Sequence, residues 1–176
     1  MKKAEKRAAP HFAIKEEWDF SSLYSGINDP KIEKDIVQIE NAYKNFAKKF
    51  NNAKETEQYT TTVSGIKRAL DAWKDLMKVT ATCMPLWYLH LLADVDTQNS
   101  KIKALFTALN DRVTKAANEI VFFNLNLAKI SKENQEKFLK EPSLAEYRMY
   151  LNSIFEVAQY NLSEKEEKIL NLVYMP

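Results

Sequence analysis

Only two glycines, Gly26 and Gly65, occur among the 176 residues of this chain. Strand-rich folds need turn residues at close intervals, and glycine fits the tight turns between strands better than any other residue. The prolines, at positions 10, 30, 85, 142 and 176, instead separate long stretches that contain no glycine. This distribution of turn residues favours a helical protein.

Apolar residues recur at steps of three and four along three long segments, as on one face of a helix. Asp29 and Pro30 suit the start of the first helix, because aspartate caps a helix and proline has no N–H to lose there. The apolar stripe of this first helix runs from Ile32 to Phe50 and predicts a core that includes Phe46. The second pattern runs from Val63 towards Pro85, where we expect a kink or break. The first stripe is Ile32, Ile36, Ile39, Tyr43, Phe46 and Phe50.

The third pattern, residues 102–130, predicts a single helix about 40 Å long, capped at Asp96 or Thr97. The segment before it, "LWYLHLLADV", is apolar on most sides, so we expect it to be buried on more than one face. Ser131 should begin a short polar helix. Two S-x-x-E capping boxes, residues 143–146 and 163–166, should open the last two helices.

These patterns together predict an all-α protein in which long antiparallel helices form a bundle. Residues 1–15 are expected to be a flexible tail, and residues 16–176 a single helical domain. Within the segment "WDFSSLY", Trp18 and Tyr24 are expected to pack on the side of the bundle. The last residues, from Leu170 to Met175, are rich in large apolar side chains and predict self-association if they are exposed.

Composition excludes several classes of function. Hydrophobic residues make up 45% and charged residues 28% of the chain, which is a globular balance. The net charge of +2 gives no electrostatic reason to expect binding to nucleic acid or to a membrane. Cys83 is the only cysteine, so the chain cannot form an internal disulfide. With no apolar stretch behind the first lysines, these features favour the cytoplasm.

The motifs of common catalytic sites are missing. His11 and His90 are the only histidines, and we expect His90 to be a core or groove residue. There is no H-E-x-x-H, no glycine-rich phosphate loop and no G-x-S-x-G. The cluster Glu164, Glu166 and Glu167 begins a helix, where carboxylates complement the helix dipole. We therefore assign no catalytic, cofactor-binding or metal-binding residue in this chain.

The order of several motifs resembles a known family. "WDFSSLY" is followed by a capped helix, then "LADVDTQNSKI", "NEIVFFNLNLAKIS", "SLAEYRMYLNSI" and finally "LSEKEEKIL". This series is similar to the N-terminal region of oligoendopeptidase F, a member of the M3 family of zinc metallopeptidases. The resemblance covers residues 16–172.

The resemblance implies an almost entirely helical fold whose N-terminal region forms a wall or lid over a channel for short peptides. It implies that zinc is bound further along the full-length enzyme, by H-E-x-x-H and a later glutamate. This chain should therefore be an inactive fragment or remnant that lacks the catalytic domain, its expected partner. The alternative is a stand-alone helical module that binds a partner protein or peptide.

Overall fold

The computed structural model describes residues 18–173, apart from the side chain of Gln159. Within that range every regular element is helical, which confirms the all-α prediction. The predicted tail, residues 1–15, lies outside the described residues. The α-helices are α1 (Pro30–Phe50), α2 (Ala53–Thr61), α3 (Val63–Thr80), α4 (Met84–Val95), α5 (Ser100–Ala117), α6 (Val121–Ala128), α7 (Lys132–Lys140), α8 (Arg148–Val157) and α9 (Glu164–Val173); the short 3-10 helices are η1 (Asn118–Ile120), η2 (Pro142–Tyr147) and η3 (Ala158–Tyr160).

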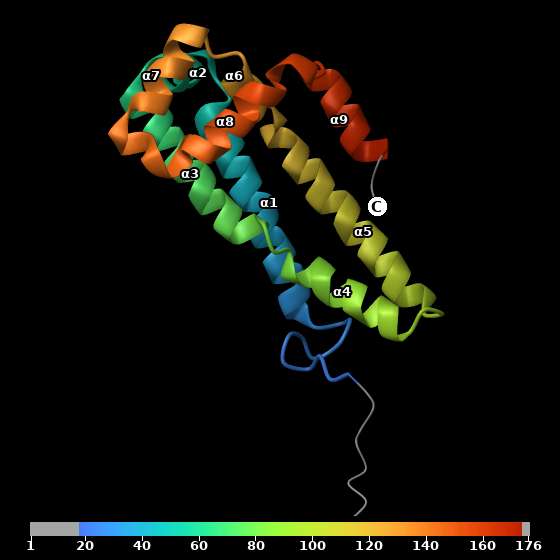
Figure 1. Ribbon diagram of the computed structural model, residues 1–176. Coiled ribbons are helices and arrows are strands. Elements are labelled where there is room, and N and C mark those ends of the chain that lie inside the picture. The colour runs from blue at the N-terminus through green and yellow to red at the C-terminus, as the bar shows by residue number, and fades with distance from the viewer. Residues whose placement is uncertain (1–17, 174–176) are drawn as a thin grey trace, which may run out of the picture.

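The longest helices, α1, α3 and α5, lie side by side, and α4 crosses from the end of α3 to the start of α5 (Figure 1). Helices α1 and α3 run in opposite directions. Helices α1 and α5 run in the same direction, because α3 returns the chain and α4 then crosses to the start of α5. The prediction of antiparallel long helices throughout is therefore not confirmed.

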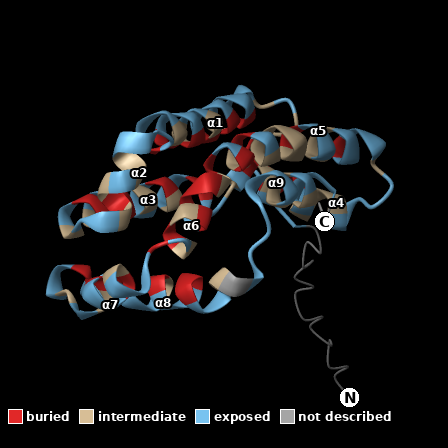
Figure 2. Cartoon of the chain, turned by 90° about the horizontal axis from the view of Figure 1, so that it is seen from above, coloured by how far each residue is buried: buried red, intermediate tan, exposed pale blue. Residues whose placement is uncertain are grey.

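Helix α1 forms as its sequence predicts. Asp29 caps it by accepting a hydrogen bond from the backbone N–H of Lys31 at 2.8 Å, and Pro30 is its first residue. All six residues of the apolar stripe are buried, including Phe46, which is 6% exposed and confirms its predicted place in the core. Figure 2 shows buried residues on the sides of α1, α3 and α6 that face one another.

Phe123 of α6 is the centre of an aromatic cluster. Its ring centroid lies 5.1 Å from that of Phe46, 5.3 Å from Tyr59 and 5.0 Å from Trp73. These residues come from four different helices. Aromatic rings at such distances add to the free energy of burial, so this cluster joins α1, α2, α3 and α6.

The predicted single helix over residues 102–130 is wrong, because the chain breaks at η1 between α5 and α6. Helix α6 is apolar on most sides and buries Phe122, Phe123, Leu125 and Leu127. A straight continuation of α5 would present one face only to the core. The break lets α6 enter the space between α2, α8 and α9, where several of its faces find partners.

Helix α2 was not predicted from the sequence, because its residues are mostly polar. Asn52 caps it by accepting a hydrogen bond from the N–H of Glu55 at 3.0 Å. The buried residue of α2 is Tyr59, whose hydroxyl accepts a hydrogen bond from Asn126 at 2.9 Å. At the junction with α3, a Cβ on Gly65 would lie 2.2 Å from the carbonyl oxygen of Gln58, so glycine permits the close approach of the two helices.

The predicted caps have mixed outcomes. Ser131 caps α7, and Ser163 and Glu166 form the predicted box at α9. The box over residues 143–146 is wrong: the Glu141 carboxylate accepts from the N–H of Ser143, and Glu146 pairs with Lys74 at 2.6 Å. The ion pair between Glu146 and Lys74 of α3 thus replaces the expected hydrogen bond between Glu146 and the start of its own helix. Asn99, rather than Asp96 or Thr97, caps α5.

The segment before α1 packs on a second hydrophobic cluster, between α1, α4 and α5. Tyr24 is 2% exposed, its hydroxyl donates to Asp35 at 2.9 Å, and its ring lies 5.0 Å from that of Tyr88. Tyr24 therefore packs this segment against the helices, as predicted. The prediction for Trp18 is wrong: it is 78% exposed and stacks on Phe20, which is the residue that packs against the cluster.

Candidate functional site

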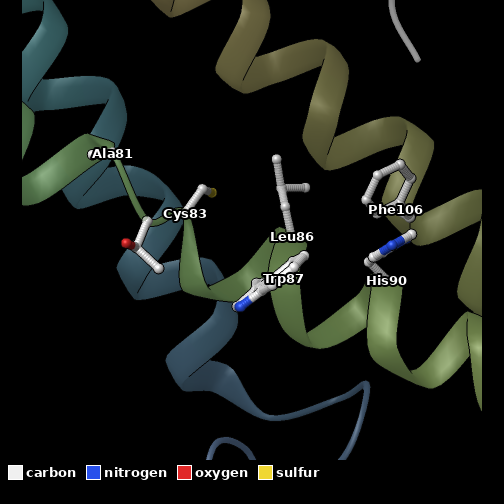
Figure 3. Close-up of a pocket in the computed structure, with 7 residues that line it drawn as sticks. Ala81, Cys83, Leu86, Trp87, His90 and Phe106 are labelled. Carbon is white, nitrogen blue, oxygen red and sulfur yellow. The ribbon is translucent and has the colours of Figure 1, made fainter.

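An open apolar groove lies where α3 gives way to α4 (Figure 3). Its volume is about 830 Å³, within the range of pockets that bind small molecules or peptide side chains. The α3–α4 connection forms one side, and α4 and α5 form the others. The lining residues are Ala81, Thr82, Cys83, Leu86, Trp87, His90 and Phe106.

The break before Pro85 creates this groove. Helix α3 ends at Thr80 and α4 starts at Met84, which places Pro85 in the first turn, where its missing N–H costs no helical hydrogen bond. Helix α4 then leaves the direction of α3 and reaches α5. The predicted break at Pro85 is confirmed.

The prediction that α4 is buried on more than one face is wrong. Tyr88 and Leu89 are buried against α1 and α5, but Trp87 is 54% exposed. The opposite side of α4 thus forms a wall of the groove rather than part of the core (Figure 3).

Three aromatic rings follow one another along this groove. Trp87 and His90 stack at 5.8 Å between ring centroids with an interplanar angle of 12°, and Phe106 of α5 lies 6.4 Å from His90. Nε2 of His90 is 3.7 Å from a carboxylate oxygen of Asp94, one turn along α4. His90 is therefore a groove residue, which was one of the two positions expected for it.

The lining of the groove is mostly apolar, with few polar side chains. Burial raises the pKa of the Cys83 thiol, so this cysteine stays protonated near neutral pH and is a poor nucleophile. Thr82 and His90 are the other polar side chains of the lining. Such a surface can hold an apolar or aromatic side chain, whose burial would be worth about 25 cal/mol per Å².

The zinc implied by the family resemblance does not fit the described residues. Among residues 18–173, no group of three histidine, cysteine, aspartate or glutamate side chains lies close enough to hold a metal ion. His90 has Asp94 as a neighbour, but catalytic zinc takes about three protein ligands. His11 lies outside the described residues.

The glutamates at the start of α9 are structural, as their helix position suggested. Glu164 pairs with Lys168 at 2.6 Å. Glu166 accepts hydrogen bonds from the backbone N–H and hydroxyl of Ser163, and these bonds lower the pKa of its carboxyl. Glu167 accepts from the N–H of Leu162. All three carboxylates therefore stabilise the first turn of α9.

Sequence reasoning did not identify the groove. Trp87 and His90 are three residues apart and so share a helix face, but the apolar run around them looked like core. The break at Pro85 was the available signal, because a change of helix direction leaves a concave surface between the two helices.

None of the described helices is both long and apolar enough to cross a membrane.

Comparison with known proteins gives two matches. The family model described as Oligopeptidase F, for the N-terminal part of M3 peptidases, matches residues 126–175, from α6 to the end of α9. An oligoendopeptidase F homolog from Borreliella burgdorferi is 25% identical over 161 residues. That alignment covers 88% of this chain and 24% of the relative, so the chain spans about a quarter of the relative's length. No solved structure matches the chain.

Proposed function

We propose that this chain, whose sequence matches the N-terminal region of oligoendopeptidase F, is the non-catalytic helical part of a zinc metallopeptidase that cleaves short peptides. The observation that carries this proposal is the match over 88% of the chain. The all-helical fold of residues 18–173 agrees with that assignment.

In this proposal, residues 16–176 form one N-terminal domain of the cytoplasmic full-length enzyme, in which the long helices line a channel as a wall or lid. The zinc and its ligands belong to a separate catalytic domain. The described residues offer an apolar groove in place of a metal site. Its Trp87, His90 and Phe106 are suited to contact an apolar side chain of a peptide in the channel.

The reading frame that follows codon 176 tests the first part of the proposal. We expect an in-frame H-E-x-x-H within a few hundred codons. A stop codon directly after Pro176 would overturn the assignment to a peptidase and favour a stand-alone helical module.

A peptidase assay tests the second part. Hydrolysis of a quenched fluorescent peptide should require the full-length protein and zinc, and should be undetectable for residues 1–176 with or without zinc. In the full-length protein, Trp87→Ala should raise KM for peptides with large apolar residues and leave kcat unchanged. Val95→Ala, an exposed apolar position on the same helix but outside the groove lining, is the matched control. Zinc-dependent hydrolysis by residues 1–176 alone would contradict the proposal.

A further inference from the structure

Helix α9 is attached to the rest of the molecule in an unusual way. It is amphipathic, yet none of its described side chains is buried. Its apolar stripe, Ile169, Leu172 and Val173, is exposed. The half-buried positions of α9 are Glu167, Lys168 and Leu170. The helix therefore lies against α5 and α6 (Figure 1) with much of its apolar surface facing outward.

A buried amide connects α9 to the break between α5 and α6. Asn118, 9% exposed, is the first residue of η1. Its Nδ2 donates to the carbonyl oxygen of Lys168 at 3.3 Å, and its Oδ1 accepts from Nδ2 of Asn171 at 2.9 Å. One side chain thus bonds α9 at two positions three residues apart, and both the donor and the acceptor of the buried amide are satisfied.

The start of α9 is stabilised by its own residues. Ser163 and Glu166 form a reciprocal capping box, with the N–H of Ser163 donating to Glu166 at 2.9 Å. The N–H of Leu162 donates to Glu167, and Lys168 pairs with Glu164. These bonds connect residues 162–168 to one another, so the capped helix can separate from α5 and α6 without losing them.

We propose that α9, together with its capping residues Leu162 and Ser163, is a clasp that opens and closes as a unit about Asn161, and that Asn118 sets the population of the closed state. Opening exposes little apolar surface, because α9 buries no side chain fully. The hydrogen bonds of Asn118 are replaced by bonds to water at a modest net cost. The clasp therefore opens well before the core around Phe123 unfolds, as a local event.

Native-state hydrogen exchange of residues 1–176 tests this proposal. A ten-residue helix that is detached from its neighbours is only marginally stable in water, so its backbone hydrogen bonds break once the clasp is open. Backbone amides in the second half of α9 should therefore exchange at least about tenfold faster than those in the middle of α1, which open only on global unfolding. Asn118→Ala should speed exchange in α9 by about a further tenfold. Exchange in α1 and α3 should not change.

Asn124→Ala is the matched control. Asn124 lies on the neighbouring helix α6, and its Oδ1 accepts a hydrogen bond from Tyr150 of α8 at 2.7 Å. This variant removes an amide that also bonds another helix, although from an exposed position, without touching the bonds to α9, so α9 exchange should match the unmodified chain. Asn171→Ala, which removes one of the two bonds from an exposed position, should give a smaller increase confined to α9 and serves if Asn118→Ala does not fold.

Either of two results would overturn the clasp. In the first, α9 exchanges as slowly as α1, which means that it opens only when the whole molecule unfolds. In the second, Asn118→Ala or Asn171→Ala speeds exchange equally in all helices, which means that the amide supports the core and not α9.

Discussion

Helices α1 and α9 have similar sequence patterns and opposite fates in the fold. Each begins at a predicted cap and carries an apolar stripe at steps of three and four. The six stripe residues of α1 are buried, whereas Ile169, Leu172 and Val173 of α9 face outward. Amphipathicity therefore predicts that a helix forms, while the presence of a complementary surface decides whether its stripe is buried.

The two helices differ in the neighbours available to them. Helix α1 lies between α3 and α5 and meets the aromatic residues of α3 and α6. Helix α9 comes last in the chain, and its neighbours also pack against other helices: α5 against α1 and α4, and α6 against α8. It docks through the polar side chain of Asn118 instead. The stability of the molecule should therefore be concentrated around α1 and be low at α9.

The largest expected difference comes from truncating one stripe residue in each helix. Phe46→Ala should destabilise the protein by about 3–5 kcal/mol, because it leaves a cavity beside Phe123 and Trp73. Ile169→Ala should cost less than about 0.5 kcal/mol. Urea denaturation followed by circular dichroism measures both. Similar costs for the two variants would mean that α9 is held as firmly as α1.

A smaller loss is expected at the junction between α2 and α3. Gly65→Ala would place a Cβ against the backbone carbonyl of Gln58, which cannot move aside as a flexible side chain could. We expect a cost of about 1–3 kcal/mol, typical of overpacking. Ala69 lies one turn further along α3 and is also buried. The control Ala69→Gly measures the change in helix propensity, about 1 kcal/mol, and so separates it from the cost of the clash. A neutral Gly65→Ala would show that α2 can shift.

The polar link between α1 and α5 should contribute less. Arg112 donates two hydrogen bonds to Glu33, at 2.7 and 2.9 Å, and two to Glu40, both at 2.9 Å. Solvent screens Glu33, so Arg112→Met should cost about 1 kcal/mol in the same denaturation experiment. A cost above about 3 kcal/mol would indicate a fully desolvated network.

The same link predicts a pH dependence. The hydrogen bonds from Arg112 lower the pKa of Glu33 below its ordinary value of 4.5. A lowered folded-state pKa gives stability that is present above the ordinary value and is lost as pH falls through the folded-state value. The urea concentration at the unfolding midpoint should therefore decrease as the pH is lowered from 5 to about 3. Arg112→Met should make that decrease smaller. An equal decrease in both proteins would assign the effect to other carboxylates, such as Asp71.

The smallest effect on stability is expected on the exposed stripe of α9. Leu172→Lys should change the free energy of unfolding by less than about 0.5 kcal/mol. It should nevertheless reduce concentration-dependent self-association, because it places a charge on an exposed apolar surface. Light scattering over a concentration series measures this. A clean monomer at high concentration in the unmodified chain would contradict the association predicted from the apolar C-terminal residues.

Local sequence signals predicted the helices better than their ends and directions. The correctly predicted caps are local arrangements, because each depends on residues only a few positions apart. They are Asp29 with Pro30 at α1, Ser131 at α7 and the Ser163–Glu166 box at α9. The Ser143–Glu146 box failed because Lys74, far away in the sequence, attracts Glu146. The uninterrupted pattern over residues 102–130 gave no sign of the break at Asn118, since apolar residues continue on both sides of it.

The sequence by itself determined the helical class, the caps of α1, α7 and α9 and the buried face of α1, because these depend on residue spacing and on bonds within one or two turns. It also carried the similarity to the N-terminal part of M3 peptidases over residues 126–175 and to an oligoendopeptidase F homolog. Only the tertiary structure decided that α5 runs parallel to α1, that Trp87, His90 and Phe106 line a groove, and that the apolar stripe of α9 faces outward. Those features depend on contacts between distant segments, whose apolar surfaces compete for the same limited core.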